Sequence, residues 1–238
     1  MSGHSKWANI QHRKGAQDAR RGNLFTKLAK EITVAAKLGD PNPDMNPRLR
    51  LAVLAARKES MPNDNIKRAI ARALPGSGEG DYSELRYEGY APGGVSVIVE
   101  CLTDNKNRTA SEARMLFSKH GGSLGEAGSV SYNFEHVGLF AYKNSAAPFE
   151  SVFETALEAG AKDVEEDDGM YIIACEIPDF GALAKALEKY GEPESAKIAW
   201  QPKVAIPLAA DEADKLEKFV GALEDNDDVQ EVYTNAEY

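Results

Sequence analysis

A proline and three glycines stand together in the segment PGSGEGD, residues 75–81. This composition is typical of a linker, because Gly and Pro interrupt helices and strands and offer little side chain for packing. Before the segment, apolar residues recur only at helical spacing; after it, strand and helix patterns alternate. We therefore expect a domain boundary near residue 80, in a chain long enough at 238 residues for two or three domains.

The charge changes sign at the same place. Residues 1–80 contain 15 Lys/Arg against 7 Asp/Glu, a net of +8, whereas residues 81–238 carry a net of −18 within the total of −10. A surface of −18 repels phosphate, but a basic face more than a Debye length of about 8 Å away keeps its own field. The sequence predicts a basic nucleic-acid-binding domain at 1–80 with the acidic part turned away from the ligand.

Three helices are expected in this basic domain. Residues 1–22 are polar and predict a mobile or loosely docked arm. The first helix spans 24–38, and Asn46 with Pro47 forms the N-cap and first turn of a second helix that runs to about Glu59. After a corner at residues 60–63, Ile66 and Ala69 mark the inner face of a third helix that ends before Pro75.

The acidic part reads as two α+β domains. We expect strands at 84–90, 94–102 and 130–136 with a helix at 107–120, and then a complete βαββαβ unit at 137–200. The tail adds a strand at 203–208, a helix at 211–224 and a strand at 229–235. The predicted fold class is multidomain α and α+β: an N-terminal three-helix domain (1–80) followed by two ferredoxin-like α+β domains, one (137–200) inserted in the other (81–136 plus 201–238). Two consecutive domains are the alternative, but they leave the first unit without half of its elements.

The arm is the first candidate for the nucleic-acid site. Lys and Arg neutralise backbone phosphates, and a Trp can stack on an exposed base. The alternative is a solvated arm whose Trp7 merely packs on the first helix. The candidate residues of the arm and the start of the first helix are His4, Lys6, Trp7, His12, Arg13, Lys14, Arg20, Arg21, Lys27 and Lys30.

The second and third helices resemble a helix-turn-helix. The third helix would present Asn65 and the candidate residues Lys67, Arg68 and Arg72 to a groove. Since the turn has no glycine, these cations are also explained as the solvated face of an amphipathic helix. We expect phosphate contacts here before base contacts.

Two further patterns are open to a ligand-binding interpretation. The glycine-rich stretch HGGSLGEAGSVSY matches no phosphate-binding fingerprint, and a flexible loop is the preferred interpretation. Thr109 and Ser111 are candidate caps of the helix at 107–120, where Lys106 and Arg108 would form an anion site.

Catalysis and metal binding lack a recognisable residue set. The two cysteines, Cys101 and Cys175, lie in predicted strands and are expected to be buried reduced thiols, with no ligand set for zinc. No catalytic motif is found, so we expect no enzyme activity, no metal and no cofactor. No apolar run is long enough to cross a bilayer, which predicts a cytoplasmic protein without membrane contact.

Five blocks of sequence together resemble the YebC/PmpR family through all three proposed domains. They are GHSKWANIQHRKGAQDARRGNLFTKLAKEITVAAKLG, MPNDNIKRAI, YEGYAPGGV, TDNKNRTASE and GGSLGEAGSVSYNF. Gln11 departs from the pattern, where a basic residue is expected. The resemblance implies a three-domain, probable transcriptional regulatory protein that binds DNA. Mitochondrial relatives are similar to translational activators, and some bacterial members to ribosome-associated factors that relieve stalling on proline-rich sequences.

Two functions therefore stay open. The first is a non-enzymatic DNA-binding transcriptional regulator, based on the +8 domain. The second is a translation factor that binds ribosomal RNA through the arm and basic ribosomal proteins through its acidic lobes. Phosphate charge is common to DNA and RNA, so the sequence does not decide between them.

Overall fold

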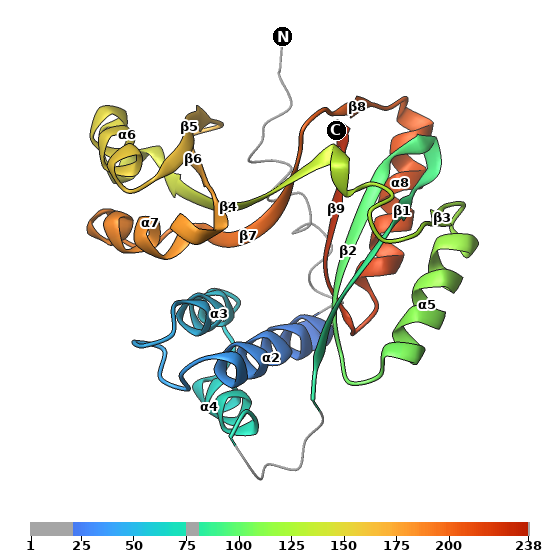
Figure 1. Ribbon diagram of the computed structural model, residues 1–238, viewed down its shortest axis with the longest axis horizontal. Coiled ribbons are helices and arrows are strands. Elements are labelled where there is room, and N and C mark those ends of the chain that lie inside the picture. Colours follow the sequence, from blue (N-terminus) through green and yellow to red (C-terminus); the bar gives the residue numbers. More distant parts are fainter. Residues whose placement is uncertain (1–20, 75–80, 238) are drawn as a thin grey trace. The chain divides into compact units, whose positions relative to one another are not determined.

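A computed structural model describes residues 21–74 and 81–237 (Figure 1). The chain divides into two compact units, and each is described by itself. One contains the helical part together with residues 81–134 and 202–237; the other contains residues 135–201.

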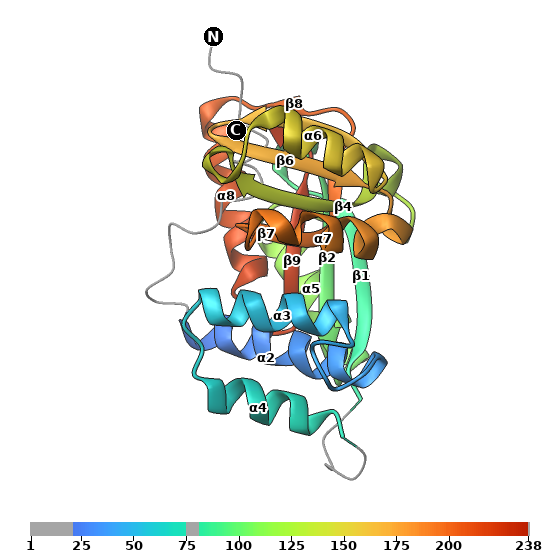
Figure 2. The ribbon, with the colours of Figure 1, turned by 90° about the vertical axis from the view of Figure 1, so that its left-hand side faces the viewer.

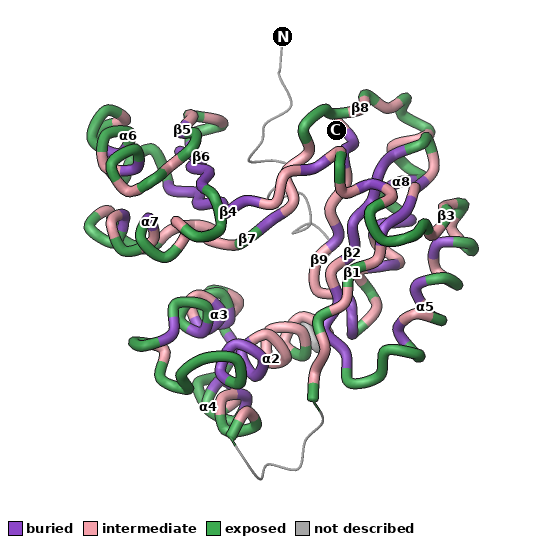
Figure 3. Tube along the Cα trace, in the orientation of Figure 1, coloured by how far each residue is buried: buried purple, intermediate pink, exposed green. Residues whose placement is uncertain are grey.

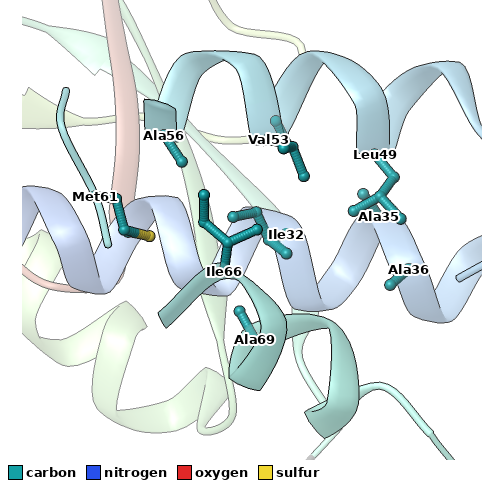
Figure 4. Close-up of a cluster of buried hydrophobic side chains, with 10 residues drawn as sticks. Ile32, Ala35, Ala36, Leu49, Val53, Ala56, Met61, Ile66 and Ala69 are labelled. Carbon is teal, nitrogen blue, oxygen red and sulfur yellow. The ribbon is translucent and has the colours of Figure 1, made fainter. Parts of the chain in front are cut away.

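The helical part consists of α2 (Arg21–Leu38), α3 (Pro47–Lys58) and α4 (Asn63–Arg72). Helices α3 and α4 each pack mainly on α2 and much less on one another, and Figure 2 shows α2 lying between them. Figure 4 shows Val53 and Leu49 of α3 pointing toward α2 from one side, and Ile66 and Ala69 of α4 from the other. Ile32 of α2 is fully buried between them. The predicted three-helix domain is confirmed, with α2 as its centre.

Buried polar groups fix the ends and crossings of these helices. The Asn46 side chain accepts a hydrogen bond from the Leu49 backbone N–H at 3.1 Å, as predicted for an N-cap, and donates to the Ala35 carbonyl at 2.8 Å. Thr33 donates from its hydroxyl to the Ala69 carbonyl of α4. Each bond satisfies a group that would otherwise be buried without a partner.

The first sheet is antiparallel, with the strand order β3-β1-β2-β9. Its strands are β1 (Ser83–Tyr90), β2 (Ser96–Thr103), β3 (Ser123–Leu124) and β9 (Val229–Thr234). Helices α5 (Lys106–Lys119) and α8 (Ala210–Glu224) lie side by side along one face of it (Figure 1). Between these helices, the rings of Phe117 and Phe219 meet edge to face at a centroid distance of 5.0 Å. The core of this layer is therefore built from segments that precede and follow residues 135–201 in the sequence.

The second sheet has the strand order β5-β6-β4-β7, that of a ferredoxin-like βαββαβ unit. Its elements are β4 (Phe134–Lys143), α6 (Phe149–Glu158), β5 (Ala161–Asp167), β6 (Met170–Cys175), α7 (Phe180–Leu187) and β7 (Ser195–Pro202). Phe140, Ile173 and Leu183 are at most 1% exposed and form the core under the two helices. The tube in Figure 3 shows this burial along β4 and β6. The multidomain α and α+β fold predicted from the sequence is confirmed.

Two expected strands of the first sheet are wrong. Residues 131–133 form the 3-10 helix η3 (Ser131–Asn133), and the strand that follows belongs to the second sheet. The stretch 203–208 supplies only β8 (Ile206–Pro207), which pairs in parallel with β10 (Ala236–Glu237). The strand next to β1 is instead the two-residue β3, where a Cβ on Gly89 would lie 2.3 Å from the Ser123 carbonyl oxygen.

The chain leaves and re-enters the first unit at neighbouring points. The Lys203 backbone N–H donates to the Asn133 carbonyl at 2.9 Å, one residue before β4 begins and one after β7 ends. The remaining short helices are η2 (Pro92–Gly94), η4 (Asn144–Ala146), η5 (Ile177–Asp179) and η6 (Glu188–Tyr190). Cys101 and Cys175 are buried free thiols, as predicted.

Candidate nucleic-acid interface

The predicted site residues fall into three groups. His4, Lys6, Trp7, His12, Arg13, Lys14 and Arg20 lie outside the described residues, and Arg21 is described only by its backbone in α2. Lys27 and Lys30 lie on α2. Lys67, Arg68 and Arg72 lie on α4.

The two lysines of α2 contact the end of α8 and the turn before β9 instead of facing solvent. Asn23, Lys27 and Lys30 follow one another at helical spacing on one side of α2. Their side-chain nitrogens donate to the carbonyls of Asp225 (3.1 Å), Glu224 (2.5 Å) and Asp227 (2.9 Å), in order. Because helix C-terminal carbonyls carry partial negative charge, cations there stabilise the end of α8. Lys27 and Lys30 thus join the helical part to the sheet. That they also contact phosphate stays a prediction.

Asp228 is the centre of a buried ion cluster at this junction. Its carboxylate accepts hydrogen bonds from Lys30 (2.8 Å), from Arg108 (2.8 Å) and from the Thr109 hydroxyl (2.8 Å). Burial alone would raise the pKa of Asp228, but these three donors outweigh it and bring the pKa down to about 2. The carboxylate is therefore ionised at neutral pH and binds α2, α5 and the turn before β9 together.

The expected caps of α5 are not formed, and Arg108, one of the two cations of the expected anion site, binds carboxylates of the protein. The N-cap is Asn105, whose side-chain oxygen accepts from the Arg108 backbone N–H, and Thr109 donates its hydroxyl to Asp228 instead. The Arg108 guanidinium pairs with Asp104 and Asp228, and these hydrogen bonds raise its pKa. Protein carboxylates thus fill the place where an external anion was predicted.

Two further cations of the helical part also pair with carboxylates. Arg48 of α3 binds Glu31 of α2 at 2.8 Å and Glu84 of β1 at 2.7 Å. Lys37 pairs with Asp81, two residues before β1 begins. These pairs repeat the arrangement at Lys30, since basic side chains of the helices meet acidic side chains of the sheet.

Several exposed cations gather on α4 and the end of α3. We call this set the α3–α4 face; its members, all exposed, are Arg57, Lys58, Lys67, Arg68 and Arg72. Ile66 and Ala69 hold the opposite side of α4 in the core, which fixes the direction of the helix. Arg68 donates to the side-chain oxygen of Asn65 and to the Asp64 carbonyl. Positive charge is thus concentrated on this face, whereas the lysines of α2 form hydrogen bonds and ion pairs within the protein.

The glycine-rich loop after α5 holds an internal anion. Glu88 of β1 is 4% exposed, and its Oε2 accepts the backbone N–H groups of Val130 at 3.0 Å and Ser131 at 2.9 Å. Burial would raise the pKa of Glu88, but these backbone donors lower it below its usual value. The loop amides that suggested a phosphate cradle are therefore partly taken by a carboxylate of the same domain.

Sequence reasoning missed the Asp228 cluster. Asp228 belongs to the acidic run EDNDD, residues 224–228, which is typical of a solvated turn. Neither Lys30 nor Arg108 lies near it in sequence. Spacing therefore carried no signal, and only the tertiary fold reveals the cluster.

The described residues show neither a metal centre nor a membrane span. No group of three His, Cys, Asp or Glu side chains within 21–74 and 81–237 is arranged to hold a metal ion. Within the same ranges, every helix is too short or too polar to cross a bilayer.

Comparison with known proteins covers nearly the whole chain. Residues 5–76 match the family model described as the TACO1/YebC protein N-terminal domain, and residues 82–236 match that described as the TACO1/YebC second and third domain. The fold is similar to the crystal structure of a conserved hypothetical protein from Aquifex aeolicus, with a TM-score of 0.84 and 45% identity. The match covers 98% of this chain and 97% of that one.

Proposed function

Because the chain belongs to the TACO1/YebC family, we propose that it is a nucleic-acid-binding regulator of gene expression, and first a DNA-binding transcriptional regulator. The observation that carries this proposal is the segregation of charge in the helical part. Lys27 and Lys30 of α2 bind residues next to the first sheet, while five cations are exposed on the α3–α4 face. Exposed Lys and Arg on a rigid helical surface bind backbone phosphates by counterion release.

The helical part is the ligand-binding region in this proposal. It is basic within a chain of net charge −10, and its core fixes α4 so that Lys67, Arg68 and Arg72 point outward. The part of the predicted arm that precedes α2, residues 1–20, adds the cations Lys6, Arg13, Lys14 and Arg20 and the ring of Trp7. The protein acts without catalysis and is cytoplasmic in this proposal.

A second candidate function is binding of structured RNA at the ribosome. It is favoured by the hydrogen bond between Arg68 and Asn65, which occupies the two side chains best suited to read base edges from α4. The other exposed cations of α4, Lys67 and Arg72, are better suited to contact phosphates than bases, as in recognition of RNA by shape. The acidic α+β part would then meet basic ribosomal proteins.

Crosslinking in cells followed by sequencing of both bound DNA and bound RNA tests the two candidates. The test variant changes Lys6, Arg13, Lys14 and Arg20 to Ala; the control changes Lys185, Lys189, Lys215 and Lys218 of the acidic part to Ala, with the same loss of charge. We expect discrete crosslinks for the wild type and the control and a strong loss for the test variant. DNA crosslinks at promoters support the first function, and ribosomal RNA crosslinks support the second. Unchanged crosslinking of the test variant contradicts the arm as a binding site.

A further inference from the structure

Helix α5 is a basic helix in an acidic domain. Residues 81–134 and 202–237 contain 17 acidic and 8 basic side chains, yet four of those eight, Lys106, Arg108, Arg114 and Lys119, lie on the 14 residues of α5. Helix α8, which packs beside it, has five acidic and two basic residues. The two helices on this face of the sheet are therefore opposite in charge.

The exposed side of α5 contains no carboxylate. We call its exposed residues other than Arg108 the α5 face; they are Lys106, Asn107, Ser111, Arg114, Met115, Ser118 and Lys119. The one acidic residue of the helix, Glu112, is half-buried and accepts a hydrogen bond from the Asn226 side chain at 2.7 Å. What solvent meets along α5 is therefore cationic or neutral.

The fold leaves three of these cations available to a ligand. Arg108 is held by Asp104 and Asp228, but Lys106, Arg114 and Lys119 form none of the ion pairs found among the described residues. Thr109, Ala113 and Phe117 are buried against the sheet, which directs the opposite side of the helix outward (Figure 3). The outward direction of Arg114 and Lys119 thus follows from the packing of α5, whereas Lys106 is exposed because it begins the helix.

We propose that the α5 face is a second phosphate-binding surface, which contacts the backbone of the same nucleic acid that the helical part binds. This inference rests on the proposed function. Arg114 and Lys119 stand about 8 Å apart along the helix axis on its outward side, within reach of neighbouring phosphates of a duplex, and Lys106 extends the cationic surface at the start of the helix. Asn107, Ser111 and Ser118 add neutral hydrogen-bond donors on the same side, as is common in phosphate contacts.

The acidic helix α8, which lies beside α5, restricts where a phosphate ligand can bind. Carboxylates of α8 such as Asp214 and Glu217 are exposed and repel a polyanion, so the ligand would follow α5 and avoid α8. Lys215 and Lys218 on α8 stand among these carboxylates, and Lys215 pairs with Asp211. They provide a matched control for charge reversal within the same domain.

The test compares Arg114→Glu/Lys119→Glu with Lys215→Glu/Lys218→Glu. Both variants reverse two exposed lysine or arginine charges on adjacent helices and change the net charge of the protein equally. The probes are a labelled RNA hairpin and a DNA duplex of matching stem sequence, titrated with the full-length protein at several salt concentrations. Thermal unfolding is measured for each variant, and Arg114→Gln/Lys119→Gln serves as a milder second variant.

We expect the α5 variant to bind at least about tenfold more weakly, and its log–log salt slope to become shallower by about 1.8, the value for two lost phosphate contacts on a duplex. The α8 control should change affinity less than about twofold, and the Gln variant should fall between. Equal weakening by the α5 and α8 variants overturns the α5 face, while wild-type binding still supports the proposed function. Failure of the wild type to bind either probe overturns both.

Discussion

Lys30 of α2 and Asp228 of the turn before β9 form a nearly buried ion pair, with an Nζ–Oδ1 distance of 2.8 Å and side-chain exposures of 11% and 4%. The pair connects the helical part to the first sheet across 198 residues of sequence. Breaking a buried pair leaves one charge without its partner, which costs far more than the net gain of forming the pair. The junction between these two parts therefore depends on a few charged groups.

Replacing Lys30 by Met tests this junction. The substitution removes one of four charged or hydroxyl donors to Asp228, so we expect a loss of about 3 kcal/mol in the free energy of unfolding, measured by urea denaturation. The matched control is Lys37→Met on the same helix, since the Lys37–Asp81 pair is exposed and its loss should leave stability unchanged. Equal effects of the two substitutions would contradict a special role for Lys30.

The pH dependence of stability tests the charge of Asp228. Its pKa is about 2 in the folded protein, below the ordinary value of about 3.9, so folding is favoured by the ionised form. This contribution, about 2 kcal/mol, is complete above about pH 4 and is lost as the pH falls toward about 2. Urea unfolding of the wild type and Asp228→Asn at several acidic pH values should show that only the wild type has this component. Parallel pH profiles would refute it.

Substituting Glu88 by Gln tests the loop that it holds. The neutral side chain keeps one acceptor oxygen but weakens the charge-assisted bonds to Val130 and Ser131, at an expected cost of about 1–2 kcal/mol. Hydrogen exchange at these two amides should become faster while exchange in β4–β7 stays the same. Glu126→Gln, an exposed change in the same loop, is the control and should alter neither property.

The two cysteines should resist alkylation in the native protein. Burial, reinforced by nearby carboxylates, raises the pKa of Cys101 to about 12 and that of Cys175 to about 11, so little reactive thiolate is present near pH 8. Mass spectrometry after iodoacetamide treatment should find both thiols unmodified in the folded protein and both modified in urea. Rapid labelling of the native protein would show that these strands open readily.

The sequence predicted most of the elements because their patterns are local. The N-cap Asn46 with Pro47, the inward residues Ile66 and Ala69, and the βαββαβ order of residues 137–200 depend on near neighbours and were found with bounds within a few residues. The strand expected at 130–136 failed because its apolar residues serve two purposes: Val130 is buried in the loop held by Glu88, and Phe134 begins a strand of the other sheet.

The candidate site was less predictable for the same physical reason. Lys27 and Lys30 are residues typical of a phosphate-binding helix. Nothing near them in sequence indicates that carbonyls and a carboxylate of residues 224–228 accept hydrogen bonds from their ammonium groups. Sequence gives the number of cations, but only tertiary contacts decide which of them stay exposed. The α3–α4 face and the α5 face are the outcome of that selection.

The hydrogen bond between Lys203 and Asn133 marks where residues 135–201 depart from their host and return. Strand β9 pairs with β2 only after this stretch has been made, since 128 residues separate Cys101 from its partner Val229. During synthesis from the N-terminus, the guest sheet can thus fold while its host still lacks an edge strand and helix α8. The Lys30–Asp228 pair likewise requires residue 228, so the link between the helical part and the first sheet is among the last contacts that a newly made chain can form.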